Sequence, residues 1–228
     1  MGSETMQRRF WSPLYDWLAW LYDGVDWFTG NTAHRLRRRA LAYLPPAGSR
    51  VLEVGFGSGR LHLELAARYA MAGLDLAPGM ARLARRRLDA RGLRSCVCVG
   101  NVYALPWLDG YFDAVLATFA FSAFPDAERA LDEMVRVTRR PEQRPESVEG
   151  PAEGWPGGRV IIVDAGEASD GNLAARLLAW LWQAFGDTMR NEVPLLEARG
   201  LPVMREEYGP WRSVHVVAGT RIFTDEHG

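Results

Sequence analysis

The sequence predicts an α/β protein whose mostly parallel β-sheet is closed by an antiparallel hairpin at its carboxyl end. From residue 50 onward, short strand-like runs alternate with arginine-rich helical stretches, which is typical of successive βαβ units. The last two strand-like runs begin about ten residues apart, too few for a helical crossover, so we expect them to pair antiparallel. Hydrophobic residues make up 48% of the 228 residues, enough for one substantial core.

The order of the runs defines the expected elements. Strands are predicted at Arg50–Val54, Ala70–Leu76, Ser95–Val99, Phe112–Thr118, Arg159–Asp164, Pro202–Tyr208 and Ser213–Thr220. Helices are predicted near residues 59–68, 79–91, 126–138, 173–185 and 193–199. Residues 141–157 are rich in Pro, Gly and Glu, which predicts a disordered surface insertion and no domain boundary.

The amino-terminal part has a different character. Residues 7–44 are helical in pattern, and Pro45-Pro46 ends this region. Its large aromatic residues are Phe10, Trp11, Tyr15, Trp17, Trp20, Tyr22, Trp27 and Phe28. We therefore expect residues 1–44 to form an aromatic helical lid on a single compact domain of residues 45–228.

The composition excludes several classes of function. The chain contains no lysine, so all 27 basic residues are arginines, and neither Schiff-base chemistry nor a lysine-containing phosphate loop is available. The net charge of −1 creates no global attraction for nucleic acid, which we do not expect as a partner. The histidines do not cluster in sequence, so no metal is expected, and His215 is interpreted as a structural histidine.

Cys96 and Cys98 stand at alternate positions of a predicted strand and therefore point to the same face. We interpret them as core thiols, because a lone C-x-C pair lacks the further ligands of a zinc site and has poor disulfide geometry. No run of about 18 apolar residues is present, so the sequence predicts no membrane span. Together these features favour a cytoplasmic protein, with peripheral contact at the inner membrane surface as a further hypothesis.

The central motif is Gly55-Phe-Gly57-Ser-Gly59-Arg60, where a predicted strand enters a glycine loop that opens a helix. Three interpretations compete. A dinucleotide fingerprint would need its third glycine where Arg60 stands, which weakens the case for NAD or FAD. An ordinary tight turn between strand and helix is the structural alternative. The third interpretation is a loop that lets a small ligand approach the backbone above the strand.

Two later residues favour the ligand-binding interpretation. Asp75 follows Glu53 by 22 residues and ends the second predicted strand, where its carboxylate could accept both hydroxyls of an adenosyl ribose. Asn101 ends the third predicted strand, and its amide could both donate to and accept from an adenine edge.

With these residues the chain resembles the class I S-adenosylmethionine-dependent methyltransferases. The resemblance covers about residues 45–220, and its motifs are residues 51–59, 73–80, 100–107, 111–115 and 133–139, the last leading to Pro-Gly-Gly-Arg-Val at 156–160. It implies a Rossmann-like, seven-stranded, mostly parallel sheet with S-adenosylmethionine as cofactor and S-adenosylhomocysteine as product. The chain departs from the family at Asn101, where Asp is usual, and in the insertion before Pro-Gly-Gly.

The resemblance also implies a set of cofactor residues. These are Glu53, Gly55, Gly57 and Gly59 around the methionine part, Asp75 at the ribose, Leu76 and Met80 beside adenine, Asn101 and Val102 at its polar edge, and Thr118 in the pocket wall.

The segment Pro13-Leu-Tyr15-Asp16 indicates where the acceptor binds, because it resembles the lid of quinone and phospholipid N-methyltransferases. This resemblance implies that Tyr15 lies near the cofactor carboxylate and closes over the acceptor. Tyr22-Asp23 repeats the dipeptide on nearly the same helix face, so Tyr22 is a second candidate. The lower-ranked substrate candidates are Trp17, Asp187, Arg190 and Asn191. The alternative is that the aromatic residues only cover the sheet.

Several functions stay open at this point. The expected activity is methyl transfer to a small or lipid-like acceptor, first the amine of a phospholipid head group, then a carbon or oxygen of a quinone-like ring or another metabolite. An amine acceptor must reach the methyl carbon unprotonated, and beyond this it needs no dedicated catalytic residue. A phenol or a quinol carbon needs a base, which the sequence does not identify. The rivals are a nicotinamide-dependent oxidoreductase and a catalytically silent binding module. The sequence leaves the oligomeric state open.

Overall fold

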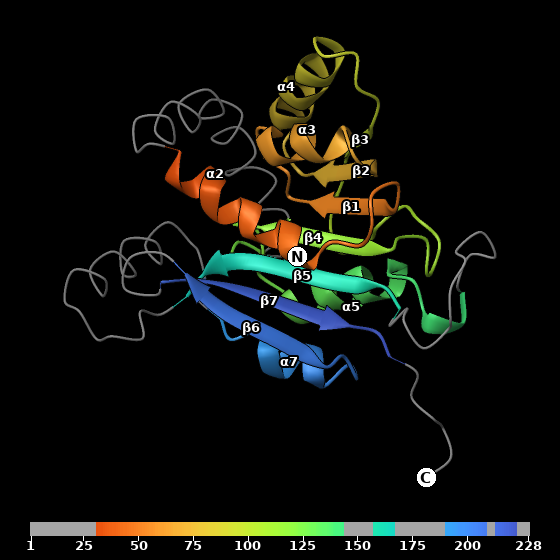
Figure 1. Cartoon of the computed structure of the whole chain (residues 1–228), viewed down its shortest axis with the longest axis vertical. Coiled ribbons are helices and arrows are strands. Elements are labelled where there is room, and N and C mark those ends of the chain that lie inside the picture. The colour runs from red at the N-terminus through yellow and green to blue at the C-terminus, as the bar shows by residue number, and fades with distance from the viewer. Residues whose placement is uncertain (1–30, 144–156, 167–189, 209–212, 223–228) are drawn as a thin grey trace, which may run out of the picture.

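The computed structural model describes residues 31–143, 157–166, 190–208 and 213–222, and the account below concerns these residues. They form a seven-stranded sheet in the order β3-β2-β1-β4-β5-β7-β6 (Figure 1). The strands are β1 (Arg50–Val54), β2 (Ala70–Asp75), β3 (Cys96–Val99), β4 (Ala114–Thr118), β5 (Arg159–Ala165), β6 (Val203–Tyr208) and β7 (Val214–Thr220). The α-helices are α2 (Thr32–Arg37), α3 (Arg60–Ala66), α4 (Pro78–Asp89), α5 (Ala127–Val137) and α7 (Val193–Glu197), and 3-10 turns η1 and η2 span Arg38–Tyr43 and Pro141–Gln143.

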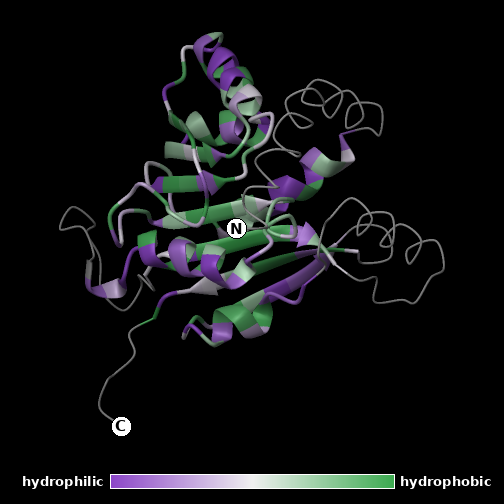
Figure 2. Cartoon of the chain, turned by 180° about the vertical axis from the view of Figure 1, so that it is seen from behind, coloured by the Kyte–Doolittle hydropathy of each residue, from purple (hydrophilic) through white to green (hydrophobic). Residues whose placement is uncertain are grey.

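The strand directions confirm the predicted architecture. Strands β1 to β5 run parallel to one another, whereas β7 pairs antiparallel with both β5 and β6. The central strands β1, β4 and β5 are almost wholly buried, as expected for parallel strands covered on both faces. Figure 2 shows the hydrophobic residues concentrated in these strands, with hydrophilic residues along the outer sides of α4 and α5.

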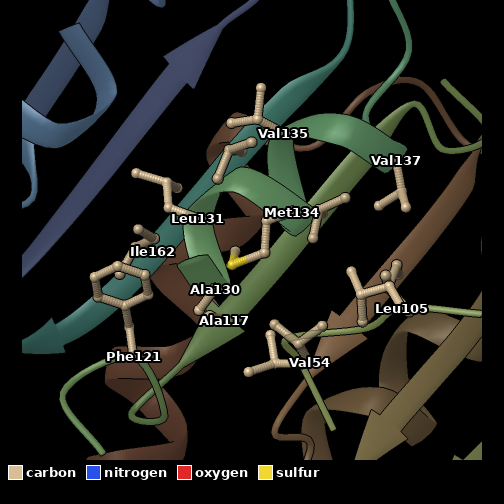
Figure 3. Packing of buried hydrophobic residues seen from close by; sticks show 14 of the residues in the cluster. Val54, Leu105, Ala117, Phe121, Ala130, Leu131, Met134, Val135, Val137 and Ile162 are labelled. Carbon is tan, nitrogen blue, oxygen red and sulfur yellow. The ribbon is translucent and has the colours of Figure 1, made fainter. Parts of the chain in front are cut away.

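Helices cover the sheet on two sides. Helix α5 packs on one face, against residues of β1, β4 and β5 (Figure 3). Leu196 of α7 and Val217 of β7 belong to the same cluster. The 3-10 turn η1 and helix α3 pack on the other face, and α3 and α4 cover Val97 of β3. Helix α5 begins where Asp126 accepts a hydrogen bond from Arg129 N at 3.0 Å, a side-chain cap that satisfies one free amide of the first turn.

The boundaries of the elements differ from the prediction by one or two residues. Strand β4 begins at Ala114 because Phe112 instead forms an isolated bridge with Thr138, and α7 ends at Glu197. Residues 141–143 of the predicted insertion form the turn η2, and residues 144–156 lie outside the described residues, as does the predicted helix at 173–185. Within the described ranges, none of the helices has the length and apolar content needed to cross a membrane.

The prediction that Cys96 and Cys98 are core thiols is wrong. The side chain of Cys96 is exposed and that of Cys98 is half-buried. The alternation correctly places both on one face of the strand, but β3 is an edge strand of the sheet, and this face is not covered there as it is over the central strands.

Candidate cofactor site

The glycine loop connects β1 to α3, and its three glycines all have positive φ angles. At two of them a side chain would also collide with the protein. A Cβ on Gly55 would lie 2.5 Å from Ala120 Cβ, and one on Gly59 would lie 2.8 Å from Ala84 Cβ. The loop is therefore held closely against the segment after β4 and against α4, and only glycine fits these positions.

Asp75 ties this loop to the end of β2. Its buried carboxylate accepts from Gly57 N at 2.8 Å through Oδ2 and from Ala77 N at 2.9 Å through Oδ1. One side chain thus braces both the glycine loop and the turn into α4. The backbone of the same residue accepts from Gly100 N at 2.9 Å, which brings the end of β3 alongside.

Glu53 lies one residue before the end of β1 and is 1% exposed. Its Oε2 lies 3.1 Å from Nδ1 of His62 on α3, and Thr118 Oγ1 donates to its Oε1 at 3.5 Å. His62 is fully buried, and its Nε2 lies 2.7 Å from Ser95 Oγ. The histidine therefore links the predicted cofactor residue Glu53 to the start of β3.

The hydrogen bonds of this chain assign its protons. Ser95 Oγ donates to Met71 O at 2.9 Å, so the single hydroxyl proton is used there and His62 Nε2 must donate to Ser95. The opposite ring atom, Nδ1, then shares one proton with Glu53 Oε2, carried by the imidazole or by the carboxyl group. In both arrangements the Glu53–His62 pair is neutral overall, which suits its complete burial.

Sequence reasoning did not assign a role to His62. The available signal was Gly73 within the apolar strand β2, because a Cβ there would lie 2.7 Å from His62 Cε1. A glycine inside a strand marks the close approach of another group, here an imidazole ring.

The other predicted cofactor residues lie along the same edge of the sheet. Met80, Val102 and Thr118 are buried, whereas Leu76 and Asn101 are half-buried. Asn101 Oδ1 accepts from Tyr103 N at 3.1 Å and so shapes the turn that follows β3. The residues come from the carboxyl ends of four neighbouring strands, where open α/β sheets bind their ligands. Their individual roles toward a cofactor stay predictions.

Comparison with known proteins identifies the family. Residues 51–141 match a family of methyltransferase domains. A phosphatidylethanolamine N-methyltransferase from Cereibacter sphaeroides is 35% identical over 153 residues, which is 66% of this chain and 67% of that protein. The chain belongs to the S-adenosylmethionine-dependent methyltransferases. The predicted family resemblance is thereby confirmed, and S-adenosylmethionine is the cofactor.

Two further comparisons place this methyltransferase among its relatives. A demethylmenaquinone methyltransferase from Thermus thermophilus is 38% identical over 134 residues, so the match covers 57% of this chain and about half, 54%, of that protein. A solved structure of a methyltransferase from Aquifex aeolicus aligns with a TM-score of 0.58 at 17% identity, covering 82% of this chain and 89% of that chain. The structural likeness supports the fold, and the relatives differ in their named substrates.

The described site of the methyltransferase fits this cofactor. S-adenosylmethionine needs a carboxylate near its ribose and a backbone loop that a ligand can approach, and Asp75 and the loop at Gly57 are the groups that would supply them. A Cβ on Gly57 would meet no atom within 4 Å, in contrast to Gly55 and Gly59. Within the described ranges, no group of three or more His, Cys, Asp or Glu side chains could hold a metal ion.

The predicted acceptor residues are only partly described in this methyltransferase. Tyr15, Trp17, Tyr22 and Asp187 lie outside the described residues. Arg190 donates to the backbone oxygens of Phe124 at 2.7 Å and Pro125 at 3.1 Å. Asn191 Oδ1 accepts from Val193 N at 3.3 Å and from Arg205 at 3.0 Å. Both described residues thus position the segment before α7.

A buried cluster of titratable groups next to Arg190 was not anticipated. His215 Nε2 lies 2.7 Å from Glu192 Oε2, and their side chains are 2% and 1% exposed. Asp164 pairs with His215 in the β5–β7 register, so the two side chains share one face of the sheet. Asp164 accepts from Ser122 N at 2.8 Å and from Ser122 Oγ at 2.9 Å.

The charge state of Asp164 follows from its surroundings. Burial, with a smaller contribution from the nearby carboxylate of Glu192, raises its pKa to about 6, although the hydrogen bonds from Ser122 and Ala165 lower it. The cluster lies at the carboxyl end of β5 and close to the cofactor site. Ser122, which binds Asp164, follows Ala120, and Ala120 lies against Gly55 of the glycine loop. It is therefore a second group of ionisable residues on the functional side of the sheet.

Proposed function

We propose that this enzyme transfers the methyl group of S-adenosylmethionine to the amine of a phospholipid head group. The observation that carries the proposal is the alignment with the phosphatidylethanolamine N-methyltransferase, which extends over two thirds of that protein. The segment Pro13-Leu-Tyr15-Asp16, which resembles the lid of the same subgroup, supports it. In this proposal Tyr15 and Tyr22 close over the acceptor and offer aromatic faces to the cation that methyl transfer produces.

The cofactor supplies a methyl group already activated by its sulfonium, so the tasks of the protein are alignment and exclusion of water. Asp75 and the glycine loop would hold the ribose and the methionine part. The neutral Glu53–His62 pair would keep the Glu53 carboxyl group in one orientation beside the loop, since Ser95 fixes the histidine ring from its other side.

A protonated amine must lose one proton before its nitrogen can attack the methyl carbon. When bound, S-adenosylmethionine would supply the activated methyl carbon and the sulfur leaving group, and the residues of the site would hold the nitrogen in line with them. The cluster of Asp164, Glu192 and His215 supports a cationic acceptor, because its two carboxyl groups near the same edge favour an ammonium group electrostatically. It also supplies groups that could take up the released proton.

A second candidate function is methylation of a quinone-like ring, and the relative from Thermus thermophilus favours it. A ring carbon or phenol oxygen requires a base, which the cluster around His215 could provide. The two candidates differ in the acceptor and share the cofactor residues.

Contact with an anionic membrane is part of the proposal for a lipid acceptor. The arginines at the end of α2 and the start of η1 have partners within the protein: Arg37 stacks 5.2 Å over Phe119, and Arg38 binds Glu64 at 2.9 Å. Arg39 lies 4.6 Å over the ring of Tyr208. These contacts support the alternative, in which the arginines form a solvated face of a helix that packs by its aromatic side. Sedimentation with vesicles that contain or lack anionic lipid tests membrane contact, and absence of binding to both would exclude it.

The function is tested with radiolabelled S-adenosylmethionine and three acceptors: phosphatidylethanolamine vesicles, phosphatidylcholine vesicles and demethylmenaquinone in detergent. We expect label in the phosphatidylethanolamine product alone, and loss of labelling in Asp75→Ala. Label in the quinone alone would establish the second candidate. Absence of calorimetric binding of S-adenosylhomocysteine to the intact chain would instead support the silent binding module.

A further inference from the structure

The pair Cys96 and Cys98 has no part in the proposed methyl transfer, yet it brings two thiols together at the protein surface. Their Sγ atoms lie 3.6 Å apart on the same face of the edge strand β3. Cys96 is exposed and Cys98 is half-buried, so a small reagent can reach the pair from solvent.

The geometry favours a bridging atom over a direct disulfide. A disulfide would need the sulfurs to approach to about 2.05 Å, a movement of about 1.5 Å within one extended strand. The two Cα atoms stand two strand steps apart, about 6.6 Å, which is near the upper end of the range seen in disulfides. A single larger atom bound to both sulfurs leaves them near their present separation, and the strand keeps its shape.

The number of sulfur ligands and their protonation favour a centre that binds two thiols, and they disfavour zinc. Zinc in proteins takes four ligands, and within the described residues no third His, Cys, Asp or Glu joins the pair. Burial and the hydrogen bond with Cys96 raise the pKa of the Cys98 thiol, and the charge of Arg85 offsets only part of this. The raised pKa favours the S–H form of Cys98, and a thiol pair can exchange its S–H bonds for bonds to a centre with two open valences.

We propose that Cys96 and Cys98 form a bidentate site for a thiophilic trivalent metalloid, for which an aryl arsenic(III) oxide is the probe. Both S–H bonds break, two arsenic–sulfur bonds form, and the arsenic-bound oxygen leaves as water with the two thiol protons. Arsenic stays trivalent, so no oxidant or reductant is required. The site is independent of the methyl acceptor.

The test titrates phenylarsine oxide into the full chain, counts free thiols with a chromogenic disulfide, and records the intact mass. We expect one arsenical per chain, loss of both reactive thiols, resistance to excess 2-mercaptoethanol and release by 2,3-dimercaptopropanol. Because the second thiol acts intramolecularly, C96S and C98S should each bind at least about 100-fold more weakly. The experiments with 2-mercaptoethanol and 2,3-dimercaptopropanol need only the wild-type protein.

A matched control keeps two thiols but separates them. In the double variant C98S/V99C the second thiol replaces Val99, which is 48% exposed and points to the opposite face of β3. This variant should behave like a single thiol, with circular dichroism verifying its fold. The proposal is overturned if it retains the arsenical as tightly as the wild type, if two arsenicals bind per chain, or if Zn²⁺ is retained at one per chain through gel filtration.

Discussion

Substitution of the Glu53–His62 pair tests the proton assignment most directly. In His62→Leu the imidazole is lost, so the Glu53 carboxyl group, 1% exposed, has no partner for Oε2, and Ser95 loses a donor. In Glu53→Gln the side-chain amide can donate to His62 Nδ1 while Nε2 continues to donate to Ser95. The isosteric change therefore preserves every hydrogen bond without the shared proton.

The two variants should differ strongly in stability. Removing one member of a buried pair costs about 3 to 5 kcal/mol, a large part of the total of about 5 to 15 kcal/mol for a domain. A chain of this size would then melt about 6 to 20 °C lower. Glu53→Gln should cost about 1 kcal/mol, because both buried polar groups keep a partner.

Urea unfolding followed by tryptophan fluorescence measures both free energies, and equal slopes against urea would show that the unfolded states are comparable. Calorimetric titration with S-adenosylhomocysteine adds a functional readout on the folded variants. If Glu53→Gln proves as unstable as His62→Leu, then Nδ1 does not accept from position 53 and the proton assignment is refuted.

Three further outcomes follow from the structure. Gly59→Ala should lose at least about 2 kcal/mol in thermal melts, because its φ of 75° adds to a steric collision, whereas Gly200→Ala, with a φ of 70° and no atom within 4 Å, should lose about 1 kcal/mol. The raised pKa of Asp164, about 6 against 3.8, stabilises the protein below about pH 4, and this stability is lost as the pH rises through 6. The free energy of unfolding of Asp164→Asn, relative to that of the wild type, should therefore increase by about 3 kcal/mol between pH 4 and pH 7. Urea unfolding of both proteins at both pH values measures this difference, and a decrease would contradict the prediction. Arg139→Met should cost about 3 to 5 kcal/mol in chemical denaturation, because it leaves Asp113 without its partner in a buried salt bridge of 2.6 Å. Adding Asp113→Asn should recover much of this loss. Equal stability of the single and double variants would contradict this reasoning.

The strands and the glycine loop were predictable because local signals determine them. Apolar runs mark buried parallel strands, and a short connection between the last two strands excludes a helical crossover. The loop from Gly55 to Gly59 was predictable because its glycines adopt positive φ angles of 66°, 55° and 75°, which other residues rarely adopt.

Contacts between distant segments were not predictable in the same way. His62 meets Glu53 only because α3 packs across β1, and nothing in their spacing announces it. Glu192, Asp164 and His215 come from three separate segments, so the sequence offered His215 only as an isolated residue on a strand. The exposure of Cys96 depends on the position of β3 at the edge of the sheet, which alternation along one strand does not encode.

The antiparallel insertion of β7 beside β5 has a consequence for how such an enzyme can diverge. It places His215, near the start of one strand, level with Asp164, near the end of its neighbour. Side chains at the functional edge can therefore be exchanged within regular strands, without remodelling a loop. In the proposed function, substrate preference could change by point substitutions at these two paired positions while the cofactor half of the sheet is left untouched.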